Sequence, residues 1–112
     1  MPAIHRDLAA GRWASMSLVE QLAHIGSEVS RCLAWRRKGN EAIAGRAFER
    51  ALELFDLTLD AGHPLPRLRE VCRAREVMCD YIAGDNAYHS TPENLERYFL
   101  AFAILARRQT GR

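Results

Sequence analysis

The chain has 112 residues, of which 48% are hydrophobic and 27% are charged, and its formal net charge at pH 7 is +2. This length and composition are typical of a single globular domain with one core. The net charge is too small to indicate nucleic-acid binding by itself. Lys38 is the only lysine, and this excess of Arg is typical of either phosphate recognition or a GC-rich coding bias.

No segment approaches the ~20 apolar residues of a membrane helix, and residues 1–17 lack the apolar run of a signal peptide. The three cysteines are Cys32, Cys72 and Cys79, and no two have CxxC spacing. All three fall on apolar faces of expected helices, so we predict buried, reduced thiols. These observations predict a cytoplasmic protein that does not contact a membrane.

The N-terminal part is expected to be a short arm followed by a long helix. Residues 1–16 have no sustained periodicity, and Trp13 is expected to anchor them, with partner binding as the alternative. Ser17 and Glu20 have capping-box spacing, which predicts a helix over 17–38 that ends at a left-handed Gly39. Gly26 within this helix is expected to allow close approach of a neighbouring element.

Asn40 is a suitable N-cap for a second helix over 41–60. Gly45 lies inside this pattern and costs about 1 kcal/mol relative to Ala in a helix, so a later start near Arg46 stays open. The short link also leaves open one kinked rod through both helices.

Two prolines in residues 62–66 end the second helix. A third helix is predicted over 65–83, with Gly84 after its end, and Thr91 with Pro92 predicts a fourth helix over 92–107. Residues 109–112 are expected to fray. Four similar helices with short links predict an all-α, antiparallel up-and-down four-helix bundle over 17–108.

Arg75 interrupts the apolar face of the third helix. That face is expected to contain six side chains: Leu68, Val71, Cys72, Met78, Cys79 and Ile82. A guanidinium in this position needs a carboxylate such as Glu49, Glu53 or Asp56, or an opening to a cavity. The alternatives are therefore a structural ion pair, a side chain that reaches water at the edge, or an anion site.

Polar side chains gather where the third helix ends. Asp85 and Asn86 suit a local turn that satisfies the backbone, and Tyr81, Tyr88 and Tyr98 are expected to surround this loop with hydroxyl groups. Six residues of this region form the predicted ligand-binding set. Its members are Arg75, Asp80, Tyr81, Asp85, Asn86 and Tyr88.

The spacing of the remaining polar residues does not indicate a metal, a cofactor or a catalytic residue. The EF-hand pattern is absent, and His24, His63 and His89 lie on different elements without i, i+4 spacing. We therefore assign no metal, no cofactor and no catalytic residue, and whether the protein is an enzyme stays open. Nucleic-acid binding through residues 36–38 and 107–108, which are basic, is a weaker hypothesis.

Two resemblances rest on short segments. KGNEAIAGRAFERALELF is similar to one tetratricopeptide helix pair, but no second copy follows at the required period. WRRKGN, AFERALELFDLT, REVMCDY and GDNAYHST, taken in order, resemble small prokaryotic all-helical proteins of HEPN-like plan. That resemblance implies a helical partner of minimal nucleotidyltransferases. The HEPN ribonuclease motif, an Arg four to six residues before a His, is absent, so the resemblance does not imply a ribonuclease.

We expect an interaction or ligand-binding module that forms a homodimer, and binding of a different protein partner stays open. Dimerisation is predicted from apolar residues that lie outside the expected core faces: Leu33, Trp35, Leu54, Leu57, Val77 and Leu100. The alternative is a small enzyme or nucleotidyltransferase partner with a polar pocket around Arg75 and residues 80–88.

Overall fold

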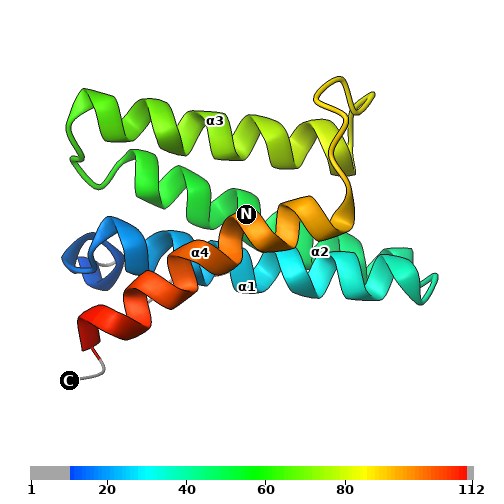
Figure 1. Cartoon of the computed structure of the whole chain (residues 1–112), viewed down its shortest axis with the longest axis horizontal. Helices are drawn as coiled ribbons and strands as arrows, with labels where there is room; N and C mark the ends of the chain where they lie inside the picture. Colours follow the sequence, from blue (N-terminus) through cyan, green and yellow to red (C-terminus); the bar gives the residue numbers. More distant parts are fainter. Residues whose placement is uncertain (1–10, 111–112) are drawn as a thin grey trace.

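The computed structural model describes residues 11–110 and contains four α-helices. A 3₁₀ turn, η2 (Trp13–Ser15), precedes α1 (Leu18–Arg37), α2 (Glu41–Leu59), α3 (Leu65–Ile82) and α4 (Pro92–Thr110) (Figure 1). Residues 11–110 contain no strand. The all-α four-helix bundle is therefore confirmed, while residues 1–10 of the predicted arm lie outside the described residues.

The first two helices begin and end at the expected residues because their caps form. Ser17 accepts a hydrogen bond from the amide of Glu20 at 3.2 Å, and the Glu20 carboxylate accepts one from the amide of Ser17 at 3.0 Å. Gly39, with φ of +78°, ends α1, and Asn40 accepts from the amide of Ile43 at 3.0 Å to start α2. The single kinked rod and the later start of α2 are therefore both wrong.

The last two helices differ from the prediction at their C-terminal ends. The Thr91 hydroxyl accepts from the amide of Asn94 at 3.1 Å, which confirms the predicted start of α4. This helix continues to Thr110, beyond the predicted end at residue 107, and residues 111 and 112 of the predicted tail lie outside the described residues. Arg107 and Arg108 in its last turn are favourable near the negative end of the helix dipole.

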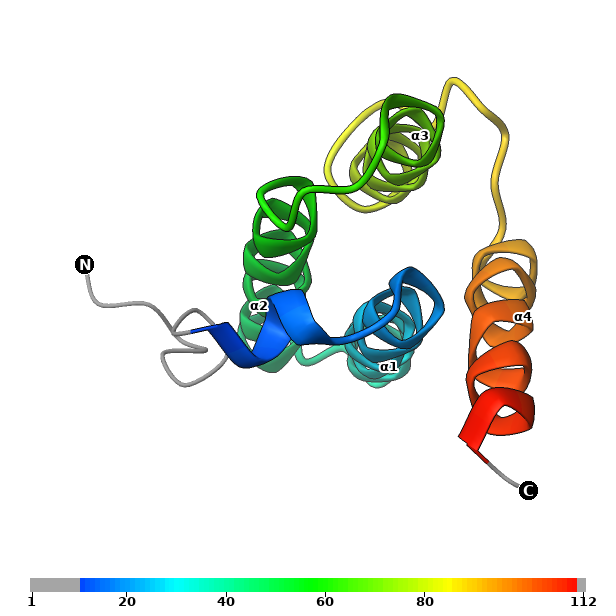
Figure 2. The same cartoon turned by 90° about the vertical axis from the view of Figure 1, so that its left-hand side faces the viewer.

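α1 is the central helix of the bundle. It packs extensively against α2 and α4, whereas α3 packs mainly against α2. Figure 2 views the helices end on and shows α1 between α2 and α4. Figure 1 shows that α4 crosses α1 obliquely. A Cβ on Gly26 would lie 2.7 Å from Cβ of Phe99, so this crossing requires glycine on α1 and confirms the expected close approach.

Trp13 closes the open end of the core between α1 and α2. Its side chain is 2% exposed, and its Nε1 donates to the Thr58 hydroxyl at 2.9 Å. Gln21, which is fully buried, donates through Nε2 to the carbonyl of Trp13 at 2.8 Å and accepts from Nε2 of His63 at 2.6 Å. For residues 11–16, the described part of the arm, the expectation that Trp13 anchors them to the bundle is confirmed.

The buried face of α3 is narrower than predicted. It consists of Val71, Ala74 and Met78, at spacings of three and four residues. Cys72 follows Val71 by about 100° around the helix and is exposed, while Cys79 is half-buried and Cys32 is buried. Burial of all three thiols is therefore wrong, because α3 has one main neighbour and buries a single stripe.

Candidate functional site

Arg75 lies at the edge of the α2–α3 contact. Its side chain is 39% exposed, and its Nε lies 3.7 Å from Oδ1 of Asp56 on α2, one of the predicted partners. Nε itself is shielded from water and has no hydrogen-bond partner, because 3.7 Å is too long for one. Arg75 is thus a partly exposed ion pair, and its predicted place in the middle of the buried face is wrong.

The Asp80 carboxylate accepts hydrogen bonds from the backbone of the loop that follows α3. Its two carboxylate oxygens accept from the amides of Ala87 and Tyr88 at 2.8 and 3.0 Å. Gly84 approaches Asp80 so closely that an added Cβ would lie 3.0 Å from the Asp80 carbonyl oxygen. The close approach, and not a left-handed φ, is what requires glycine at position 84.

Asn86 closes the second half of the loop. It has a φ of 55°, its Oδ1 accepts from the amide of Ser90 at 2.8 Å, and its Nδ2 donates to the carbonyl of Ser90 at 3.0 Å. Asp85 is exposed. The local turn predicted for Asp85 and Asn86 therefore accounts for the polar composition of the loop without a ligand.

The three tyrosines do not surround the loop together. Tyr81 faces α1, where the guanidinium of Arg36 lies 5.4 Å from its ring centre. Tyr88 and Tyr98 instead donate through their hydroxyls to Glu76 and Glu70 on α3, both at 2.9 Å.

The hydrogen bond to the Glu76 carboxylate raises the pKa of Tyr88. Burial, together with the hydrogen bond to Glu70, raises the pKa of Tyr98. Both phenols are therefore neutral at physiological pH.

Two hollows adjoin this region. A wide, open groove follows the outer face of α3 and contains Arg75, Asp80 and Tyr88 of the predicted set. Its four carboxylates are engaged: Asp56 by Arg75, Asp80 by the loop amides, Glu76 by Tyr88 and Glu70 by Tyr98. A smaller pocket of about 300 Å³ lies between α3, the loop and α4, and Tyr88 is the one predicted site residue that also lines it.

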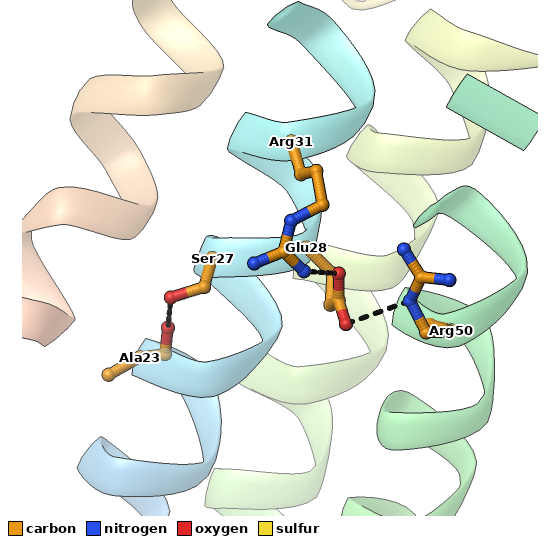
Figure 3. A network of polar contacts seen from close by, with 5 residues as sticks. All are labelled: Ala23, Ser27, Glu28, Arg31 and Arg50. Carbon is orange, nitrogen blue, oxygen red and sulfur yellow. Dashed lines mark hydrogen bonds and ion pairs between the residues drawn. The ribbon is translucent and has the colours of Figure 1, made fainter. Parts of the chain in front are cut away.

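Among residues 11–110, the most buried charged side chain was not predicted from the sequence. Glu28 on α1 is 7% exposed and contacts two arginines (Figure 3). One carboxylate oxygen accepts from Arg31 of the same helix and the other from Nε of Arg50 on α2, at 3.1 Å for Arg50. Glu28 follows the buried Ile25 by three residues and therefore lies on the apolar stripe of α1. This spacing could have indicated that the carboxylate is buried.

The basic residues do not form one surface. Arg37 pairs with Glu96 at 3.4 Å, and Lys38 lies over the ring of Trp35, with Nζ 4.8 Å from the ring centre. The C-terminal ends of α1 and α4, which carry the two basic segments, lie at opposite ends of the bundle (Figure 1). Nothing in this arrangement favours a continuous nucleic-acid groove.

No protein-family model, curated protein or solved structure matches the chain. The resemblance to the HEPN group therefore stays a prediction. None of the described helices is both long enough and apolar enough to cross a bilayer. Among residues 11–110, no three His, Cys, Asp or Glu side chains converge as metal ligands.

Proposed function

We propose that the protein is a helical interaction module that binds a second copy of itself through the outer face of α4, defined by Leu100, Ile104 and Leu105. These side chains are 56%, 46% and 45% exposed, and they lie on neighbouring turns of one helix. Isolated exposed leucines are common on protein surfaces, but three large aliphatic side chains together favour a binding surface. This cluster is the observation that supports the proposal.

The sequence of α4 supports burial on two sides. Residues 98–106 contain no charged side chain, and a helix that is apolar all round normally has neighbours all round. Leu95 and Phe99 fill the side toward the core, where each is 2% exposed. None of the described elements covers the other side.

A second copy is the partner that best matches the charges of this helix. The first turn of α4 contains Glu93, and the last turn contains Arg107 and Arg108. A two-fold axis near Leu100 would set two α4 helices antiparallel, so that Glu93 of each copy lies near Arg108 of the other. Such an interface is self-complementary, as a symmetric dimer requires.

The other apolar residues that predicted dimerisation contribute less. Leu33 and Leu54 are each 2% exposed and belong to the core, so their placement outside the core faces is wrong. Trp35, Leu57 and Val77 are half-buried. Of the six residues, Leu100 has the exposure that an interface needs.

Sedimentation equilibrium over a wide range of protein concentrations tests the proposal. We expect the wild-type chain to dimerise, and the double variant Leu100→Glu, Ile104→Glu to remain monomeric with an unchanged helical circular dichroism spectrum. Leu65→Glu is the matched control, because Leu65 is 59% exposed on α3, away from the proposed interface. A monomeric wild-type chain, or equal loss of dimer in the control, would contradict the proposal.

A further inference from the structure

The pocket between α3 and α4 is separate from the outer face of α4. It exists because α3 packs mainly on α2, so that the loop and the first turns of α4 enclose a space beside α3. Its volume is about 300 Å³, and seven described residues line it: Arg73, Val77, Tyr88, Ser90, Asn94, Leu95 and Tyr98. This volume lies at the lower end of the range for small-molecule sites.

The walls and floor of the pocket suit a flat ring. Tyr88 and Tyr98 are held by their hydroxyl bonds to α3, so their rings have fixed positions. Leu95, which is 2% exposed, and Val77, which is half-buried, add aliphatic surface. Aromatic ligands pack well against tyrosine rings.

Arg73 is the one charged side chain among these lining residues. In the part of the chain that the structure describes, no carboxylate lies within ion-pair distance of it, in contrast to Arg75 with Asp56. Its neighbours on α3, Glu70 and Glu76, accept the tyrosine hydroxyls instead. A guanidinium binds a carboxylate through two parallel hydrogen bonds, and Asn94 and Ser90 can add donors.

We propose that this pocket binds a small, single-ring aromatic carboxylic acid, with the ring against Tyr88 and Tyr98 and the carboxylate on Arg73. The ligand class follows from one unpaired cation, two fixed aromatic rings and an aliphatic floor within a space that admits one ring. Binding here does not depend on self-association, because the lining residues Leu95 and Tyr98 are not part of the outer face of α4.

Three probes of similar size and different charge test the ligand class: phenylacetate, phenylacetamide and 2-phenylethylamine. Each is titrated into the ¹⁵N-labelled full chain up to about 10 mM, a range that covers the weak affinity expected of so small a ligand. We expect phenylacetate to shift the amide signals of Tyr88, Ser90 and Asn94, phenylacetamide to bind more weakly, and the amine to bind most weakly.

A pair of variants on one helix separates the pocket from general charge effects. Arg73→Gln should weaken phenylacetate binding about tenfold or more and leave phenylacetamide nearly unchanged, because a charge-assisted hydrogen bond is lost. Arg69→Gln is the control, since Arg69 lines the wide groove on α3 and not the pocket. Preference for the amine, shifts confined to other regions, or no shifts with any probe would overturn the proposal.

Discussion

Glu28 on α1 and Arg75 on α3 are both charged residues that helical spacing places beside an apolar stripe, yet their surroundings differ. Glu28 lies between α1 and α2, is 7% exposed and contacts two arginines. Arg75 is 39% exposed and has one carboxylate at 3.7 Å, which is itself 65% exposed. The difference follows from the number of neighbours, because α1 packs on two helices and α3 mainly on one.

The features that stabilise the fold and the candidate binding features lie in different parts of the molecule. The surroundings of α1 contain the Trp13 anchor, the Gly26 crossing and the Glu28 ion pairs. The surroundings of α3 contain the open groove, the loop held by Asp80 and the pocket beside Arg73. Substitutions around α1 should therefore reduce stability more than substitutions on the outer side of α3.

The largest effect is expected at the arm anchor. Trp13→Ala should lower the free energy of unfolding by about 3–5 kcal/mol, because it removes a fully buried aromatic side chain. Urea denaturation measures this change. Trp13→Phe retains most of the ring volume and loses the bond to Thr58, so it should cost about 1–3 kcal/mol. If Trp13→Ala unfolded like the wild type, the arm would not be part of the core.

Gly26 lies where α4 crosses α1, and Gly45 lies on an open part of α2, so we expect opposite effects when each is replaced by alanine. Gly26→Ala should lower the free energy of unfolding by about 1–3 kcal/mol, because its Cβ would clash with Phe99. Gly45→Ala should raise it by about 0.5–1 kcal/mol, since Gly45 is helical and a Cβ there meets no atom within 4 Å. Thermal melts of the two variants in one buffer would reveal the difference, and a Gly26→Ala variant as stable as the wild type would contradict the close approach of Phe99.

Glu28→Gln should lower the free energy of unfolding by about 1.5–3 kcal/mol. The substitution leaves Arg50, whose side chain is 25% exposed, without its carboxylate. Chemical denaturation at neutral pH measures the loss. Glu96→Gln is a suitable control, because the side chain of Glu96, the partner of Arg37, is more exposed than that of Glu28. This substitution should cost less than roughly 1 kcal/mol, the value of a surface ion pair. Equal losses would contradict the difference in burial.

The smallest effect is expected at Arg75. Arg75→Gln should change the free energy of unfolding by about 1 kcal/mol or less, and added salt should reduce the difference further. Denaturation at low and high ionic strength measures both quantities. A loss as large as that of Glu28→Gln would mean that Arg75 is buried, and the contrast between the two helices would fail.

Local signals predicted the secondary structure well. Ser17, Asn40 and Thr91 cap their helices as expected, because a capping bond joins residues only three positions apart. The candidate site was predicted less well. Asp80 and Asn86 bond to their own loop, and Arg73 was not part of the predicted ligand-binding set although it lines the pocket. The pocket beside Arg73 also depends on Tyr98, 25 residues away, which no local pattern connects to it.

Local sequence signals are sufficient to predict the four helices, their starts and the breaks between them, since these depend on backbone geometry and on hydrogen bonds within one turn. Which charges are buried, and which helix faces remain open, depends on how the helices pack. A helix has the same apolar stripe in its sequence whether it packs against one neighbour or two. Periodicity alone therefore assigned Cys72 and Arg75 to a buried face wider than the one that α3 forms. The packing of α1 between α2 and α4 set those outcomes, and it left the outer face of α4 and the pocket beside α3 accessible.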